Sequence, residues 1–335
     1  MRIGVAGAGR IGSFHAQTLC RLAGVDSVVV ADANREFART LSERLGIDYL
    51  ERPGDLFTAG IDGLVIAAAT DAHADLIVAG VGAGVPVFCE KPAAPDAAST
   101  RAVIANVSGS NVPVYIGFQR RFDAGFTTAR NAVLSGRLGW VHTLRACTLD
   151  PAPPPVAYIV ASGGFFRDCC VHDFDAIRWI TGQEVIEVYA RGAVRGEDFF
   201  REAGDVDTVA ALLELTDGTF AHVSASRYNA HGYDVRLEVL GSQRSISVGL
   251  DDCMPLESAE AGISFPSGQP HSYFIERFAA AYVAELTAFT EVVAGTGNVQ
   301  PMCTLSDALE ATLIAEACEL SRLEHRPVRM AEVRA

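Results

Sequence analysis

A glycine-rich turn near the N-terminus constrains the fold of this chain more than any other feature. The turn reads Gly7-Ala8-Gly9-Arg10-Ile11-Gly12, and it lies between a predicted strand at 3–6 and a predicted helix near 11–22. Asp32 ends the next predicted strand, twenty positions beyond Gly12. A strand, a G-x-G-x-x-G turn, a helix and an acidic residue at this distance form the fingerprint of a dinucleotide-binding βαβ unit. The N-terminal region therefore predicts a Rossmann domain.

The glycines of this turn have separate physical tasks. Gly7 permits the tight turn, Gly9 lets the backbone approach a pyrophosphate, and Gly12 lets the helix pack close to the strand. The phosphates of a dinucleotide are expected at the N-terminus of the helix, beside Arg10 and Ile11. A glycine-rich turn in an unrelated α/β domain is the alternative.

Asp32 and Arg35 bear on the choice between NAD and NADP. The carboxylate of Asp32 can accept both ribose hydroxyls of NAD, and its charge would repel the 2′-phosphate of NADP. Arg35 lies three positions further on and could turn toward such a phosphate, which weakens the preference. We expect NAD to be the working cofactor.

The composition excludes several classes of protein. The chain has 335 residues, of which 49% are hydrophobic and 20% charged, as is typical of a globular protein with two domains. A formal net charge of -14 argues against nucleic acids and anionic membranes as partners. Eight cysteines without framework spacing predict reduced thiols, and the apolar runs are too short to cross a bilayer. With no targeting peptide before the first predicted strand, we expect a cytoplasmic protein.

The pattern of predicted elements changes near residue 118. Before it, apolar strands alternate with amphipathic helices, which indicates a parallel sheet covered on both faces. After it, strands follow one another without helices between them, and Asp217-Gly218 marks a tight hairpin. We predict an α/β fold with a doubly wound parallel Rossmann sheet in 1–118 and an α/β domain with a mostly antiparallel open sheet in 119–335. In this second domain we expect strands at 140–149, 185–193, 208–215, 219–226, 233–240 and 245–248, and helices at 122–134, 273–294 and 306–323.

The segment 162–175 carries the candidate catalytic groups. It places Asp168, His172 and Asp175 at i, i+4 and i+7, on one face of a predicted helix. An imidazole with a carboxylate one turn away on each side is typical of a general base near neutral pH. A solvated surface histidine or a hydrogen-bonded core histidine is the alternative.

A metal site in the same segment is not expected. Cys169 and Cys170 are adjacent, so on a helix they point about 100° apart and cannot chelate from one face. Neither a CxxC pair nor an HxxxH motif accompanies them.

Glu90-Lys91-Pro92 is a third candidate site element. It follows the predicted strand 85–89, at the carboxyl edge of the sheet, where α/β folds bind ligands. A lysine held between a strand end and a proline is a positioned charge, although exposed lysines usually only contact solvent.

These motifs together resemble the Gfo/Idh/MocA family of sugar and cyclitol oxidoreductases, most closely its inositol 2-dehydrogenase branch. The resemblance is specific because Glu90-Lys91-Pro92 occurs together with Asp168, His172 and Asp175. It runs nearly end to end, and the matching stretches are Gly7–Gly12, Asp32, Thr70–His73, Glu90–Pro92, Gly117–Asp123, Gly163–Asp175, Gly232–Asp234, Glu276–Phe278 and Tyr282.

The resemblance implies roles for individual residues. Lys91, Asp168 and His172 would form the catalytic group. Besides the glycine turn, Asp32 and Arg35, the cofactor would be bound by Thr70, His73, Glu90 and Lys91. The substrate would be surrounded by Lys91, Arg121, Asp150, Asp168, His172, Asp175 and Tyr233. The resemblance also implies a C-terminal open sheet and, frequently, a homotetramer built on the exposed face of that sheet.

One stretch departs from the inositol dehydrogenase pattern. Those enzymes carry His-x-Asn-Pro at the end of the long strand, whereas this chain has Thr148-Leu149-Asp150-Pro151 and then a stiff loop to Pro155. Myo-inositol, scyllo-inositol, an inosose and a pyranose such as glucose therefore stay open as substrates.

The resemblance implies an enzyme of sugar or cyclitol metabolism. We expect NAD-dependent oxidation of a secondary hydroxyl of a cyclic polyol to a ketone, with hydride transfer to the nicotinamide and His172 as general base. The alternatives are an NAD-using glycosidase of the same family and a non-catalytic regulator that binds NAD(H).

Overall fold

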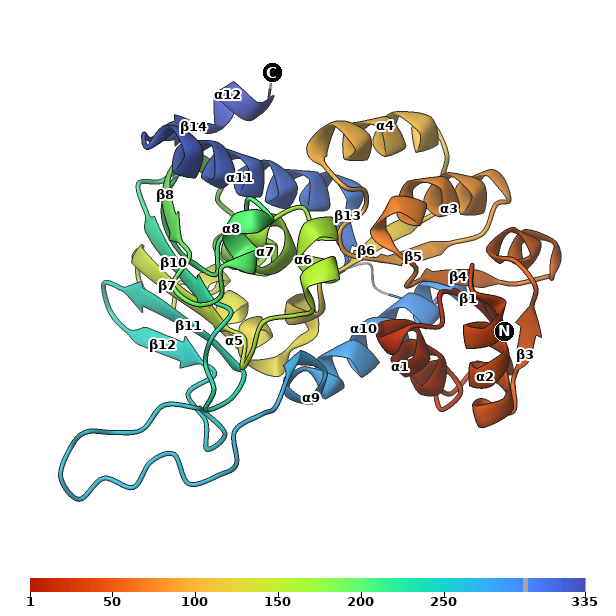
Figure 1. The fold of residues 1–335 in the computed structure, drawn as a ribbon, viewed down its shortest axis with the longest axis horizontal. Helices are drawn as coiled ribbons and strands as arrows, with labels where there is room; N and C mark the ends of the chain where they lie inside the picture. The colour runs from red at the N-terminus through yellow and green to blue at the C-terminus, as the bar shows by residue number, and fades with distance from the viewer. Residues whose placement is uncertain (298–300, 335) are drawn as a thin grey trace. The chain divides into compact units, whose positions relative to one another are not determined.

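The computed structural model describes residues 1–297 and 301–334, and the chain divides into two compact units (Figure 1). The first unit comprises Met1–Phe122 and Ala280–Leu309, and the second comprises Asp123–Ala279 and Glu310–Ala335. Each unit thus combines two segments that are distant in sequence. A domain boundary after residue 118 stays a prediction.

The first unit is built on a seven-stranded sheet. Its six strands from the N-terminal segment run parallel, and the short strand β13 pairs antiparallel with β6. The strands in spatial order are β13 (Cys303–Thr304), β6 (Val114–Gly117), β5 (Val87–Glu90), β4 (Gly63–Ile66), β1 (Arg2–Ala6), β2 (Ser27–Ala31) and β3 (Asp48–Leu50). The doubly wound parallel sheet is confirmed, and β3 and β13 are additions to the predicted strands.

The helices of the first unit connect these strands. They are α1 (Arg10–Leu19), α2 (Arg35–Leu45), η1 (Pro53–Thr58), α3 (Thr70–Gly82), α4 (Ala97–Val107), η2 (Gln119–Phe122) and, from the second segment, α10 (Ala279–Val293). Residues 273–294 were predicted as one helix, but α9 (Phe274–Arg277) ends at Phe278, whose φ of -110° interrupts the helix before α10.

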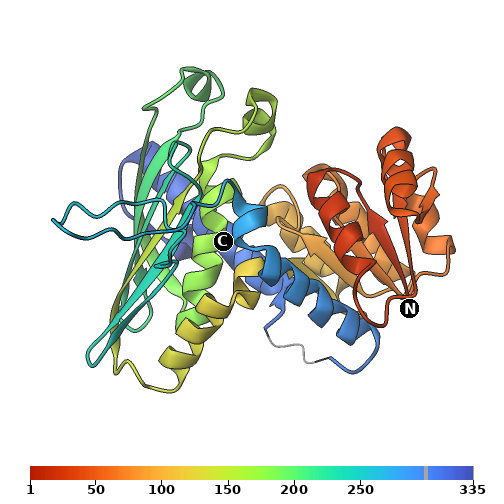
Figure 2. The same ribbon diagram turned by 90° about the horizontal axis from the view of Figure 1, so that it is seen from below.

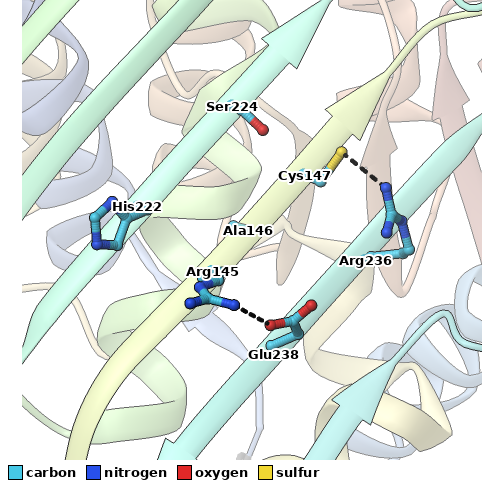
Figure 3. A pocket seen from close by; sticks show the side chains of 7 residues that line it. All are labelled: Arg145, Ala146, Cys147, His222, Ser224, Arg236 and Glu238. Carbon is cyan, nitrogen blue, oxygen red and sulfur yellow. Dashed lines mark hydrogen bonds and ion pairs between the residues drawn. The ribbon is translucent and has the colours of Figure 1, made fainter.

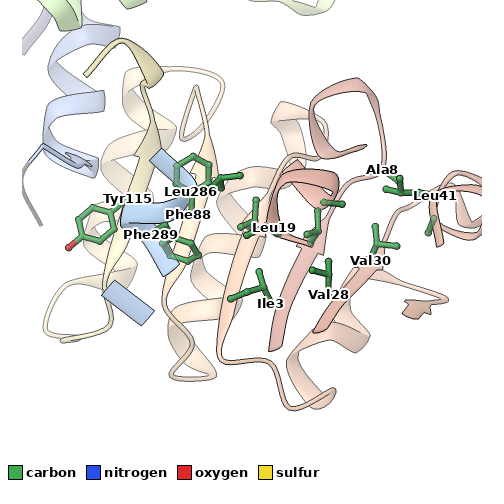
Figure 4. Packing of buried hydrophobic residues seen from close by; sticks show 14 of the residues in the cluster. Ile3, Ala8, Leu19, Val28, Val30, Leu41, Phe88, Tyr115, Leu286 and Phe289 are labelled. Carbon is green, nitrogen blue, oxygen red and sulfur yellow. The ribbon is translucent and has the colours of Figure 1, made fainter. Parts of the chain in front are cut away.

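The hydrophobic core explains why α10 belongs to the first unit (Figure 4). Leu286 and Phe289 of α10 are fully buried, and they pack in one cluster with Ile3 of β1 and Phe88 of β5. The rings of Phe88 and Phe289 have centroids 5.8 Å apart. Burial of such side chains stabilises a fold by roughly 1.5–3 kcal/mol each, so this helix is an integral part of the core.

The second unit is built on another seven-stranded sheet. All its strand pairs are antiparallel except β7 with β10, which run parallel. The strands in spatial order are β12 (Ser245–Val248), β11 (Asp234–Gly241), β7 (Val141–Leu149), β10 (Phe220–Ser226), β9 (Thr208–Leu215), β8 (Val185–Ala193) and β14 (Val328–Arg329). The mostly antiparallel sheet is confirmed, as is the hairpin turn, where Gly218 has a φ of +84°.

Helices cover one face of this sheet. Figure 2 shows α5 and α7 together on that face. Residues along β9 alternate between buried and exposed, the pattern of a sheet with one covered and one open face. The helices of this unit are α5 (Ala124–Leu134), α6 (Val156–Ala161), η3 (Phe166–Cys170), α7 (Val171–Thr181), α8 (Phe199–Glu202), α9, α11 (Leu305–Glu324, which begins in the first unit) and α12 (Met330–Arg334).

Within the described ranges, no helix is both long enough and apolar enough to cross a membrane.

Candidate active site

The glycine turn is closely packed at two of its glycines and open at the third. Gly7 has a φ of +111°, and a Cβ added there would lie 2.3 Å from the carbonyl oxygen of Ala67. A Cβ at Gly12 would lie 2.0 Å from the carbonyl oxygen of Gly7, so both positions require glycine. A Cβ at Gly9 would meet no atom within 4 Å. The turn is therefore closely packed on one side and open at Gly9, where α1 begins at Arg10 without a side-chain cap.

Asp32 lies beside this turn at the end of β2. Its Oδ2 atom accepts a hydrogen bond from the amide of Ala8 at 2.6 Å, and its Oδ1 atom accepts one from the amide of Asn34 at 2.7 Å. The guanidinium of Arg35 is instead paired with Glu51, with 3.0 Å between Nη1 and Oε2. Both side chains of this pair are more than half exposed, so solvent weakens it. Asp32 is thus fixed at the turn, whereas Arg35 is held by an exposed pair.

His73 connects two loops at the carboxyl edge of the parallel sheet. Its ring is buried in α3, which begins at Thr70. Nδ1 lies 2.7 Å from the carbonyl oxygen of Pro92, and Nε2 lies 3.1 Å from that of Ala68. His73 therefore fixes the turn that contains Lys91 and Pro92.

His15 is a residue of this region that the sequence analysis missed. It is fully buried on α1, and its Nε2 atom lies 2.7 Å from Oε1 of Glu90, the last residue of β5. Lys91 follows Glu90 directly. The available signal was a titratable residue on the buried face of the nucleotide-binding helix.

Asp168 and His172 lie in two different kinds of helix. Asp168 belongs to η3, one turn of π-helix, and His172 belongs to the first turn of α7. The predicted single α-helical face is therefore wrong at Asp168, because a π turn has a wider spacing than an α turn. His172 is half-buried, whereas Asp175 is completely buried. Single π turns inside helices occur frequently at functional sites.

Arg227 joins two of the predicted substrate residues and was also missed. Its Nη1 atom lies 2.7 Å from Oδ2 of Asp150, and its Nη2 atom lies 2.6 Å from Oδ2 of Asp168. The hydroxyl of Tyr158 donates to Oδ1 of Asp168 at 2.7 Å. Burial alone would lower the pKa of Arg227. The negative charges of Asp168 and Asp150 have a larger effect in the other direction, so the pKa of Arg227 lies above its ordinary value. The sequence signal was a charged residue directly after a predicted strand.

The other predicted substrate residues are largely buried. Tyr233 is buried, and its amide donates to the carbonyl oxygen of His271 at 2.7 Å. Arg121 belongs to η2 in the first unit, where its Nη1 atom lies 3.3 Å from Oδ2 of Asp307. The structure thus brings together Asp150 and Asp168 in the second unit, and it places Lys91 and Arg121 in the first.

The two cysteines that follow Asp168 are buried. Burial raises the pKa of Cys169 and of Cys170 well above the ordinary value. A thiol must lose its proton to bind a metal. Within the described part of the chain, no group of three or more His, Cys, Asp or Glu side chains is placed to hold a metal ion.

The fold and these groups define a class of protein. The first unit is a Rossmann unit with an open glycine turn and Asp32. The second is an α/β unit that carries titratable groups at the start of a helix. This combination is typical of a dinucleotide-dependent oxidoreductase.

The chain belongs to the Gfo/Idh/MocA oxidoreductase family. Residues 1–118 match the family model described as the oxidoreductase family with an NAD-binding Rossmann fold, and residues 126–247 match the GFO/IDH/MocA C-terminal domain. The resemblance expected from the sequence is confirmed, and so are NAD as the cofactor and oxidoreductase as the class of enzyme.

Named relatives match over almost the whole chain. The inositol 2-dehydrogenase of Rhizobium meliloti is 36% identical, and the match covers 99% of each chain. The myo-inositol 2-dehydrogenase of Thermotoga maritima is 35% identical over 99% of each chain. The crystal structure of scyllo-inositol dehydrogenase from Lactobacillus casei with bound NAD(H) and scyllo-inositol is 29% identical, with a TM-score of 0.85, and covers 99% of each chain.

Proposed function

We propose that this chain is an NAD-dependent dehydrogenase that oxidises one secondary hydroxyl of a cyclic polyol, of the inositol class, to a ketone. The proposal rests on three features that occur together in this chain. They are the open glycine turn, Lys91 at the end of a strand, and His172 at the start of a helix. The names of the full-length relatives support an inositol-like substrate.

The residues of the first unit fit NAD. The open side of Gly9 and the first amides of α1 would hold the pyrophosphate, and Asp32 would accept hydrogen bonds from the ribose hydroxyls. Bound NAD supplies the nicotinamide ring that accepts the hydride from the substrate carbon.

His172 takes the proton of the substrate hydroxyl. Its Nδ1 atom is buried, so we assign Nε2 as the proton acceptor. An imidazole is suited to this task because its ordinary pKa lies near neutral pH. General-base catalysis of this kind contributes about 10²–10⁴-fold to the rate. The carboxylate of Asp168 favours the imidazolium that forms.

Lys91 donates a hydrogen bond to the alkoxide that develops as the proton leaves. This interaction is strongest in the transition state and therefore acts on kcat. On either side of Lys91, the ring of His73 holds the carbonyl oxygen of Pro92 and the ring of His15 holds the side chain of Glu90. Such support keeps a reacting group in its productive geometry.

Asp150 contributes to substrate choice. One of its oxygens, Oδ2, is held by Arg227, and a carboxylate can accept but not donate hydrogen bonds. Asp150 therefore favours a substrate hydroxyl over a ring oxygen or a carbonyl at this position. Sites that bind hydroxyls discriminate sharply, because a missing partner leaves a buried polar group unsatisfied.

The open face of the second sheet supports a homotetramer. It exposes large apolar side chains on adjacent strands, namely Ile186, Tyr189, Leu212 and Phe220. Figure 3 shows a hollow on the same sheet, with Arg145 paired to Glu238 at 3.2 Å and Arg236 directed at Cys147. The volume of this hollow, about 250 Å³, is below the roughly 300–1,000 Å³ of small-molecule sites, so we assign this face to subunit contact and not to the substrate. Light scattering on the wild-type protein tests the tetramer, which a monomeric mass contradicts.

A substrate screen tests the proposed activity. Wild-type protein with NAD is given myo-inositol, scyllo-inositol and pyranoses, and the absorbance of NADH is followed. The proposal expects NADH to accumulate in proportion to ketone with at least one cyclitol. Cleavage of a glycoside without accumulation of NADH would favour the glycosidase, and NAD binding without any turnover would favour the regulator.

A further inference from the structure

Arg227 lies where three separate segments of the second unit meet. It is the first residue after β10, and Asp150 is the first residue after β7. These strands are parallel neighbours with Leu149 opposite Ser226, so both residues leave the sheet at the same end. The amide of Asp150 donates to the carbonyl oxygen of Ser226 at 2.9 Å, which closes this end of the strand pair. The third segment is the π turn that contains Asp168.

The Arg227 side chain is fixed on several sides. It is only 5% exposed, and its guanidinium carbon lies 4.4 Å from the centre of the Phe165 ring. The backbone amide of Arg227 donates to the carbonyl oxygen of Asp207 at 2.8 Å. The two terminal nitrogens of a planar guanidinium, Nη1 and Nη2, can bind two carboxylates at once. The single ammonium group of a lysine, on a flexible side chain, is less suited to this.

The hydrogen bonds to Asp168 favour the ionised form of this carboxylate. Oδ2 accepts from Arg227 and Oδ1 accepts from Tyr158, so both oxygens are engaged by donors. Hydrogen bonds to the charged form of a carboxylate, together with a neighbouring cation, stabilise its ionised state. Asp168 is thereby held as a fixed negative charge rather than as a proton acceptor.

We propose that Arg227 is a positioning residue that couples substrate selection to catalysis. Through one guanidinium it fixes Asp150, which selects the substrate, and Asp168, whose charge favours protonated His172. This inference rests on the proposed dehydrogenase function and extends it to a residue outside the predicted site. Removal of Arg227 would leave two nearby carboxylates without their shared cation, so one of them would become protonated or move.

The test compares Arg227 with a matched arginine of the same unit. Arg178 is also buried and holds one carboxylate, with 2.7 Å between its Nη2 atom and Oε1 of Glu184. We expect Arg227→Ala to lower kcat by on the order of 10²-fold, the effect of misplacing a reacting group by about 1 Å. Arg227→Lys should recover part of this loss. Arg178→Ala should keep the wild-type kcat even where its melting temperature falls.

Two readouts separate positioning from a purely structural role. Free guanidinium ion, at concentrations far below those that denature proteins, should restore part of kcat in Arg227→Ala. Asp168 acts in its ionised form, and a carboxylate without its cation is harder to ionise. The limb of the kcat/KM pH profile that reports this ionisation should therefore move to higher pH in this variant. An unchanged kcat per folded enzyme, or a loss equal to that of Arg178→Ala without rescue, would overturn the proposal.

A further variant keeps the proposal testable if Arg227→Ala does not fold. Tyr158→Phe removes the donor to Oδ1 of Asp168 and keeps Arg227, and we expect a smaller fall in kcat with a pH shift in the same direction. NAD affinity should stay near wild type in all of these variants, because the cofactor site belongs to the first unit. Turnover by the wild-type enzyme on cyclitols is measured first, so that its absence would count against the proposed function and not against Arg227. If only Tyr158→Phe folds and its pH profile is unchanged, the proposal is also overturned.

Discussion

The Nε2 atom of His15 lies 2.7 Å from Oε1 of Glu90. The contact joins the nucleotide-binding helix α1 to the residue that precedes Lys91. His15 is fully buried between Phe88 and Tyr282, with ring centroids 5.9 Å and 5.8 Å away. The helix that follows the glycine turn and the strand end that precedes Lys91 are therefore linked by a polar contact in an apolar environment.

This contact predicts that Glu90→Ala destabilises the protein. The substitution leaves the buried ring nitrogen of His15 without its acceptor, which costs roughly 1–3 kcal/mol. Urea unfolding with and without NAD measures the effect. Glu51→Ala is the matched control, because Glu51 forms an exposed pair with Arg35, and its removal should change stability little. Equal stability of Glu90→Ala and the wild-type protein would show that the contact is not stabilising.

Asp32 predicts a preference for NAD over NADP. Asp32→Ser should raise kcat/KM with NADP relative to NAD, because the charge that repels the 2′-phosphate is gone. Adding Glu51→Ala should raise this ratio further, since Arg35 is then released from its pair and can reach the phosphate. A wild-type enzyme with a higher kcat/KM for NADP would contradict the role given to Asp32.

Asp150 predicts a change in substrate ranking. Asp150→Asn keeps the shape of the side chain but replaces one acceptor oxygen by a donor. The order of cyclitols and sugars by kcat/KM should change, while the pH dependence contributed by His172 should persist. An unchanged order would move substrate choice to Arg121, Asp175 or Tyr233.

The parts of the fold that rest on local signals could be predicted from the sequence. The strand, turn and helix around Gly7–Gly12 are contiguous, so their pattern is readable in one stretch. The strands Val185–Ala193, Thr208–Leu215 and Ser245–Val248 have the predicted bounds, because each strand is likewise one contiguous stretch of sequence.

Features that depend on distant contacts could not be predicted. The return of α10 to the first core depends on Leu286 and Phe289, which pack against Phe88 from about two hundred positions further along the sequence. The ion pair of Arg227 with Asp150 depends on the parallel pairing of β7 with β10, whose segments are far apart in the chain. The spacing of apolar residues along the sequence does not indicate which distant segments pair. The π turn at Asp168 could not be predicted either, because its sequence has the pattern of an ordinary α-helix.

The buried thiols predict selective alkylation. Burial raises the pKa of the thiols of Cys89, Cys169, Cys170 and Cys318, so they stay protonated at pH 8, and only thiolates react quickly. Iodoacetamide treatment followed by mass spectrometry should leave these four unlabelled in the native protein and label them after denaturation. The exposed Cys20 should react before these four. Fast native labelling of Cys169 or Cys170 would contradict the burial of the η3 turn.

Isotope transfer follows the proposed hydride from a ring carbon of the cyclic polyol to NAD. Inositol deuterated at the carbon that bears the reacting hydroxyl is incubated with the wild-type enzyme and NAD, and the reduced cofactor is analysed by mass spectrometry. We expect one deuterium per molecule of NADH formed, an equal amount of ketone, and loss of both products in His172→Ala and Lys91→Met variants that still bind NAD. Reduced cofactor without deuterium, or full transfer in the His172→Ala and Lys91→Met variants, would contradict this expectation.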